Sequence, residues 1–340
     1  MKAVEGALLL LMLVLGSVCA VQDLRRGIVP NRCIALGGIA ACALQGVSLI
    51  CFSRDFTLWW LVNMLLGDAL AVCLYAAGLW AAGDAKLFML MFLCVPARLI
   101  EPYALSCAVI PYCFIFVPAF FFILADSFIQ ALRRSERFDA GSRFSLRDIK
   151  GFLAVMVEMT AWQALSCAAF PSFWEENAFF ASALMMVLAY ACSGRAFLQR
   201  GFVIALHTLS LGVMAVMGVW RFSAAPWWMV GVTLLCLATG RWASGYNYRR
   251  IPTNQVREGM ILSAGTVLSF RMSHVKELPQ DPREDMKVRL TEAQAQAVRR
   301  WEKSKHGKDT VVILRKLPFA VLISAGFMGW ILVRTGGLFI

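Results

Sequence analysis

Two aspartates at the edges of apolar segments are the residues in this chain best suited to chemistry. Asp23 opens the stretch Asp-Leu-Arg-Arg-Gly-Ile-Val-Pro-Asn at 23–31, called motif one, directly after the first apolar run. Asp84 lies in Ala-Ala-Gly-Asp-Ala-Lys-Leu at 81–87, called motif two, between the third and fourth runs. A carboxylate is costly at membrane depth and is usually kept there for a task. Two carboxylates that face each other can share a proton and act as an acid and base pair.

Three residues near this pair have roles that the sequence leaves open. Gly83 has no Cβ, so a substrate backbone or a neighbouring helix can approach Asp84 closely. Lys86 either favours the ionised form of Asp84 or anchors its helix at the membrane surface. Asp68 is a third acid, inside the third apolar run. We interpret it as a hydrogen-bonding residue in helix packing, with a substrate-site role or a place in a proton path as alternatives.

Composition places the chain in a membrane. It has 340 residues, of which 60% are hydrophobic and only 16% charged, whereas a soluble domain has about a quarter charged. The net charge of +12 is typical of basic cytoplasmic loops, so nucleic acid is not an expected partner. The eleven cysteines form no C-x-x-C pair, so we expect no metal site and no disulfide framework.

Ten apolar runs are long enough to approach the length of a membrane span, about 20 residues. The expected fold is therefore an all-α polytopic membrane protein with about ten transmembrane helices. The runs cover residues 3–21, 33–52, 57–81, 85–100, 104–125, 151–172, 178–194, 201–220, 226–242 and 317–334.

Charge sets the expected orientation. The first twenty residues resemble a cleavable signal peptide, but Arg25, Arg26 and Arg32 follow the run and favour a cytoplasmic location for its far end. We expect a retained helix with the N-terminus outside. This orientation puts the other basic connections in the cytoplasm and brings Asp23 and Asp84 to the same, cytoplasmic face.

The expected domains follow from these runs. They are a membrane core at 1–125, a basic cytoplasmic loop at 126–150, an additional four-helix block at 151–242, a small α+β cytoplasmic domain at 243–316 and a last transmembrane helix at 317–340. In the cytoplasmic domain, residues 256–271 predict two short strands and residues 310–315 another. Thr291 and Gln294 form a capping-box pattern at the start of a helix.

Motif one resembles the first motif of the type IV prepilin and preflagellin peptidases, which are membrane aspartic endopeptidases. In that family an aspartate is followed by basic residues and then by Ile-Pro-Asn. Arg26 supplies the basic character here, and Pro30 and Asn31 fall at the family's spacing from Asp23. Val29 stands where isoleucine is usual.

Motif two resembles the family's second motif, Gly-x-Gly-Asp followed by Lys and Leu. Gly83, Asp84, Lys86 and Leu87 match it, and Ala81 replaces the first glycine. The small basic domain and the stretch Arg-Lys-Leu-Pro-Phe at 315–319 before the last helix resemble the archaeal preflagellin branch. The block at 151–242 has no counterpart in that family.

The resemblance implies an activity at the cytoplasmic face of the plasma membrane. The enzyme would remove the leader peptide of a pilin-like precursor, using water activated between Asp23 and Asp84. It implies no metal and no cofactor, and its partners would be the precursor and membrane lipids. Members of the family that also methylate the new N-terminus carry a cytoplasmic C-x-x-C domain, so we expect cleavage without methylation. The residues expected to support the pair are Arg26, Pro30, Asn31, Gly83 and Lys86, with Asp68 as a possible auxiliary residue.

Three alternatives remain beside this interpretation. A proton-coupled transporter would use intramembrane acids such as Asp68 and Glu158, but it leaves the two motifs unexplained. A presenilin-type protease would show Tyr-Asp and Pro-Ala-Leu sequences, which the chain lacks. A catalytically inactive scaffold of a pilus or secretion machine is compatible with Ala81.

Overall fold

The computed structural model describes residues 2–50, 54–76, 80–133, 245–273, 275–284, 288–315 and 317–336, with a few isolated positions between 170 and 243. The chain divides into two compact units. The first comprises Met1–Pro102, Ile110–Phe138 and Ala243–Ile340, and it contains both motifs. The second comprises Tyr103–Val109 and Asp139–Trp242. The helices expected at 178–194, 201–220 and 226–242, nearly all of 151–172, and Glu158 lie outside the described residues.

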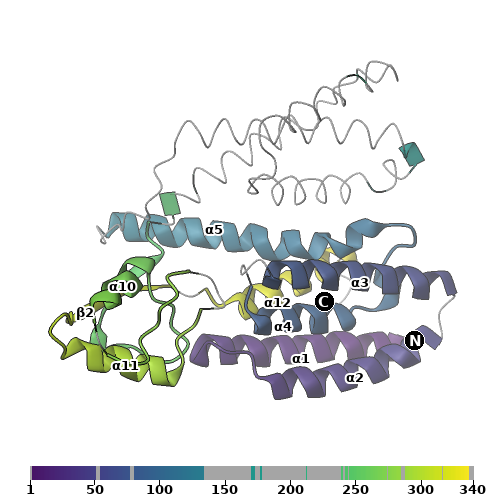
Figure 1. Cartoon of the computed structure of the whole chain (residues 1–340). Coiled ribbons are helices and arrows are strands. Elements are labelled where there is room, and N and C mark those ends of the chain that lie inside the picture. Colours follow the sequence, from purple (N-terminus) through teal and green to yellow (C-terminus); the bar gives the residue numbers. More distant parts are fainter. Residues whose placement is uncertain are drawn as a thin grey trace. The chain divides into compact units, whose positions relative to one another are not determined.

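The first unit is mostly helical, and its long helices run side by side (Figure 1). Four of the described helices, α1, α2, α3 and α5, are long and apolar enough to cross a membrane. A fifth, α12, is apolar but shorter. The helices are α1 (Lys2–Arg26), α2 (Asn31–Ile50), α3 (Arg54–Ala76), α4 (Ala82–Leu93), α5 (Ile110–Leu132) and α12 (Phe319–Arg334).

Motif one forms the tight connection between α1 and α2. Gly27 adopts a positive φ of 69°, and its N–H donates to the carbonyl of Asp23 at 2.8 Å. Glycine is the residue that commonly ends a helix in this conformation. The carbonyl of Pro30 then accepts from the N–H groups of Cys33 and Ile34 at 3.1 and 3.3 Å, which begins α2.

The helix expected at 85–100 is shorter in the structure. It begins earlier, at Ala82, and ends at Leu93. Pro96 accounts for the early end, because proline lacks an N–H and disfavours helix at the residue before it. Twelve residues span about 18 Å, well under the membrane interior of about 30 Å. The described residues thus give four candidate spans, and a count of about ten is not confirmed.

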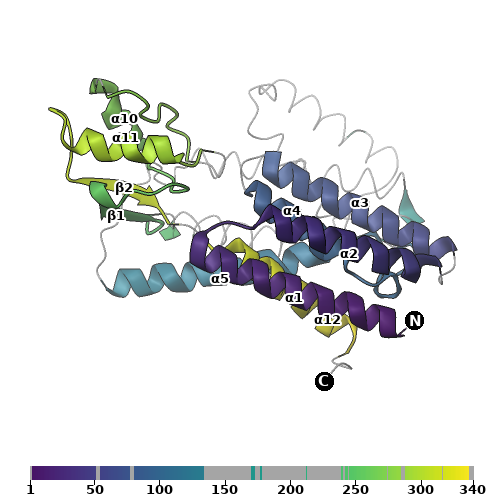
Figure 2. The same cartoon turned by 90° about the horizontal axis from the view of Figure 1, so that it is seen from below.

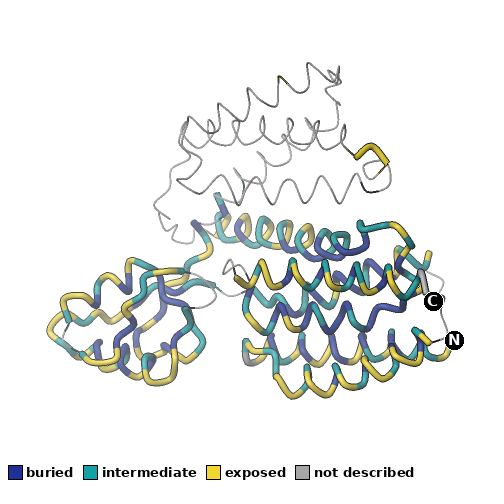
Figure 3. Tube along the Cα trace, turned by 45° about the vertical axis from the view of Figure 1, so that its right-hand side comes forward, coloured by how far each residue is buried: buried dark blue, intermediate teal, exposed yellow. Residues whose placement is uncertain are grey.

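The short helix α4 is the most buried helix of this bundle. Leu87, Phe88, Met91 and Phe92 are all fully buried, and α4 contacts α2, α3 and α12. The Phe88 ring stacks on Tyr112 of α5 with centroids 4.3 Å apart. Exposed residues lie on the outer faces of the helices (Figure 3), and many are large and apolar, as lipid contact requires.

A small domain follows residue 245 and precedes α12. Its strands β1 (Tyr248–Pro252) and β2 (Thr310–Leu314) pair antiparallel, with Tyr248 opposite Leu314. The helices α10 (Ala264–Ser269) and α11 (Glu292–Glu302) complete it (Figure 2). Phe270 and Trp301 meet edge to face at 4.7 Å in its core.

Two of the predictions for this domain are confirmed and one is wrong. Thr291 and Gln294 exchange both bonds of the capping box at the start of α11, at 3.2 and 3.0 Å, and β2 occupies 310–314. The two strands expected in 256–271 are replaced by a single bridge at Leu262 and by α10. Ser263 caps α10 by accepting from Thr266 N–H, a helix-starting contact that the glycine-rich alternation concealed.

Candidate active site

Asp23 lies in the last turns of α1, with only 5% of its surface exposed. Its Oδ2 accepts a hydrogen bond of 3.2 Å from the backbone N–H of Ala320. Ala320 is the second residue of α12, and the first N–H groups of a helix have no partner within it. The first turn of α12 therefore holds the Asp23 carboxylate, although 297 residues separate the two.

Asp84 is the third residue of α4, with 6% of its surface exposed. Its Oδ2 accepts from the N–H of Ala81 at 3.2 Å, the bond that the acidic residue supplies in a capping box. Ala81 itself has φ −75° and ψ 156°, a region that any L-residue adopts. The alanine at position 81 therefore places no strain on the backbone.

The structure brings motif one and motif two into direct contact. A Cβ placed on Gly83 would lie 3.2 Å from Cβ of Val29, so these two residues meet with no spare room. Beside this contact, Nζ of Lys86 donates to Oδ1 of Asn31 at 3.1 Å. The connection between α1 and α2, the first residue of α2 and the first half of α4 therefore meet in one place, called the motif corner.

Of the residues expected to support Asp23 and Asp84, some lie at the contact between the two motifs and others do not. Pro30 shapes the connection into α2, and Lys86 contacts Asn31 of motif one. Arg26 is the last residue of α1, and its side chain lies outside the described residues. Asp68 belongs to α3 and takes no part in the contacts that join the motifs.

Asp68 has an unusual environment of its own. Within the described part of the chain, its Oδ1 is buried without a hydrogen-bond partner. The carbonyl of its neighbour Gly67 accepts from the Tyr112 hydroxyl at 2.6 Å. The hydrogen bond between α3 and α5 at this point is thus made by Gly67. Asp68 has one oxygen without a hydrogen-bond partner among the described residues.

Sequence reasoning missed two contacts of the motif residues, one between Ala320 and Asp23 and one between Val29 and Gly83. Ala320 contributes through its N–H, which any residue except proline carries, so its type gives no signal. The stretch Leu-Pro-Phe at 317–319 marks the start of a helix, since Pro318 stands at the N-cap of α12. Val29 was expected only as a substitute for isoleucine, and its contact with Gly83 depends on the tertiary fold.

The arrangement suits acid and base chemistry at a poorly hydrated site. Asp23 and Asp84 come from different helices, each is buried, and each accepts a backbone N–H. In the described ranges, no group of three His, Cys, Asp or Glu side chains is placed to hold a metal ion.

Comparison with known proteins adds no relative. The chain matches no family model, no curated protein and no solved structure.

Proposed function

We propose that this chain is a membrane aspartic endopeptidase. It removes the leader peptide of type IV pilin-like or flagellin-like precursors at the cytoplasmic face of the plasma membrane. Water between Asp23 and Asp84 attacks the scissile carbonyl carbon. One carboxylate takes a proton from the water, and the other, protonated, donates its proton to the substrate as the peptide bond breaks. No metal or cofactor takes part, and the product is not methylated.

The observation that carries the proposal is the contact between the two motifs. Lys86 and Asn31 are 55 positions apart in the chain and are joined at 3.1 Å. Gly83 and Val29 touch beside them. An active site built from two distant segments requires contacts that hold those segments together, and this contact joins motif one to motif two.

Burial gives further support. Both carboxylates are almost completely removed from solvent, where electrostatic interactions are stronger than in water. Peptide hydrolysis by an aspartate pair needs one carboxyl group to act as the acid and the other as the base.

The proposal also includes the arrangement of the chain in the membrane. We infer about ten transmembrane helices, an N-terminus outside the cell, and a cytoplasmic location for the motif corner. Arg25 follows Asp23 closely, Lys86 lies in motif two and Arg133 follows α5, all at helix ends assigned to the cytoplasm. Positive residues favour that side of a membrane. At the opposite ends, Glu5 and Glu101 pair with the arginines present there.

Co-expression with a pilin-like precursor tests the proposal. We expect the wild-type chain to convert the precursor to a shorter product on a gel, and both Asp23→Asn and Asp84→Asn to abolish the conversion. Asp281→Asn, which alters an exposed acid paired with Arg283, is the matched control and leaves conversion intact. Asp68→Asn retains partial conversion. Conversion that survives both motif substitutions contradicts the proposal.

A proton-coupled transporter is the second candidate, because of Asp68. A buried carboxylate oxygen with no hydrogen-bond partner in the described residues is typical of groups that take up and release protons in membranes. Reconstituted vesicles with an internal pH dye separate the candidates. Proton flux that Asp68→Asn abolishes, together with an uncut precursor, favours the transporter over the peptidase.

A further inference from the structure

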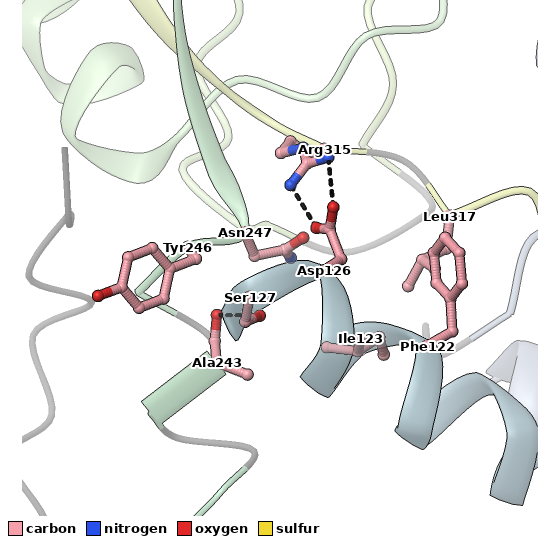
Figure 4. Close-up of a pocket in the computed structure, with 9 residues that line it drawn as sticks. All are labelled: Phe122, Ile123, Asp126, Ser127, Ala243, Tyr246, Asn247, Arg315 and Leu317. Carbon is pink, nitrogen blue, oxygen red and sulfur yellow. Dashed lines mark hydrogen bonds and ion pairs between the residues drawn. The ribbon is translucent and has the colours of Figure 1, made fainter. Parts of the chain in front are cut away.

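A second polar cluster joins α5 to the chain entering α12. Arg315 follows β2 directly, and Asp126 lies near the end of α5 (Figure 4). The guanidinium Nη1 lies 2.5 Å from Asp126 Oδ2, and Nη2 lies 3.3 Å from Oδ1. The two hydrogen bonds fix the orientation of the Arg315 guanidinium relative to the Asp126 carboxylate as well as their distance, because the two planar groups match in shape.

Neighbouring groups hold both members of this pair. Gln130, one turn further along α5, donates from Nε2 to Asp126 Oδ2 at 2.8 Å. The backbone N–H of Arg315 donates to the carbonyl of Asn247 at 2.8 Å, just before β1. The pair therefore joins α5, the start of the small domain and the start of α12, and it borders a cavity of about 50 Å³.

The exposure of the pair limits what it can contribute to stability. The side chains of Arg315 and Asp126 are 37% and 36% exposed, and ion pairs open to water add little to folding. We therefore expect the pair to affect mainly the position of the segment that leads from Arg315 into α12.

Five positions separate Arg315 from Ala320, and the residues just before Ala320 are held in place. Pro318 restricts the backbone before α12. The ring of Phe319 packs on Trp80 and Phe116, with centroids 6.4 and 6.3 Å away. The next residue, Ala320, donates its N–H to Asp23. A shift at Arg315 is thus passed to the hydrogen bond on Asp23 within five residues.

We propose that Arg315 and Asp126 are positioning residues for the Asp23 carboxylate. By tying the first turn of α12 to α5, they hold the Ala320 N–H over Asp23, and through Arg315 the docking of the small domain governs the geometry of the active site. This inference rests on the proposed peptidase function for its catalytic consequence. Its structural consequence is independent of any substrate.

Kinetics test the catalytic consequence. In Asp126→Asn and Arg315→Gln, kcat for precursor cleavage falls about tenfold, since errors of roughly 1 Å in a catalytic group cost up to a hundredfold. KM is expected to stay unchanged, because in this proposal the pair acts on the Asp23 carboxylate and not on substrate binding. The exchange D126R/R315D restores the rate. Arg300→Gln, which breaks the exposed Arg300–Glu277 pair in the same domain, is the control and has no effect.

Amide hydrogen exchange tests the structural consequence without substrate. The fragment covering residues 317–324 is expected to exchange several-fold faster in Asp126→Asn and Arg315→Gln, and at the wild-type rate in Arg300→Gln and D126R/R315D. Fragments from α2 and α3 act as internal standards for folding. Unchanged exchange in both single variants overturns the positioning role, even if the wild-type chain cleaves its precursor. Faster exchange in a protein that cleaves nothing supports the contact but contradicts the proposed function.

Discussion

Lys86 and Asn31 are joined by a hydrogen bond of 3.1 Å between Nζ and Oδ1. This bond ties the second turn of α4 to the first residue of α2. Asp84 lies two residues before Lys86, and Asp23 lies at the end of the helix that leads into Asn31. In the proposed peptidase, the relative position of the two aspartates would depend on this contact and on the neighbouring contact between Gly83 and Val29.

The Lys86–Asn31 bond is expected to matter for rate more than for stability. Both side chains are exposed, so losing the bond costs about 1 kcal/mol or less in the free energy of unfolding. We expect Lys86→Ala and Asn31→Ala each to lower kcat/KM for cleavage about tenfold, a loss of about 1.4 kcal/mol. A double-mutant cycle checks the coupling, since the double variant should be no slower than either single one. Effects that simply multiply contradict the role of the bond.

Gly83→Ala tests the close approach of the two motifs. An added Cβ would lie 3.2 Å from Val29 Cβ, and forcing extra volume into a packed place costs about 1–3 kcal/mol. We expect a lower thermal midpoint and slower cleavage, both partly restored by adding Val29→Ala. Gly38→Ala on α2 is the control, because nothing lies within 4 Å of its Cβ position. Equal behaviour of the two variants contradicts the contact.

Tyr248 predicts an alkaline loss of stability in the small domain. Burial, and then the hydrogen bond of 2.6 Å that its hydroxyl donates to Glu284, raise the pKa of Tyr248 above its usual value of about 10. The folded chain therefore keeps this proton to a higher pH than the unfolded chain. The resulting stability is present below about pH 10 and is lost as the pH rises further.

Thermal unfolding of wild type and Tyr248→Phe across pH 8–11 measures this effect. At pH 8 the thermal midpoint of the wild type should lie about 2–4 °C above that of Tyr248→Phe, as expected for the loss of one hydrogen bond. The gap should narrow above pH 10, because only the wild type has the ionisable group. Two curves that stay parallel to pH 11 would show that Tyr248 does not cause the alkaline loss.

Local signals were enough to predict several parts of the fold. The apolar runs gave α1, α2 and α3 within a few residues. The side chains of Thr291 and Gln294 act on neighbouring backbone, so the start of α11 was also predictable. The end of α4 was predicted too late because the apolar run continues to residue 100, although Pro96 is a local signal for the end of a helix.

The contacts between distant segments were not predictable in the same way. The charge pattern predicted that Asp23 and Asp84 lie on one face of the membrane. No pattern in the sequence links Ala320 to Asp23, because every residue except proline carries a backbone N–H. Arg315 and Asp126 are 189 positions apart, and no local pattern in the sequence links them. Such pairs depend on how the helices pack, which periodicity does not specify.

The most direct test uses the purified chain in liposomes with a purified pilin-like precursor. Mass spectrometry of both fragments identifies the cut bond and its rate. We expect one cut at the end of the leader, which a metal chelator does not prevent. We expect the rate to fall by about 10²–10⁴-fold in Asp23→Asn and in Asp84→Asn. Thermal unfolding confirms that each variant is folded. Cleavage at the wild-type rate in either folded variant contradicts the account.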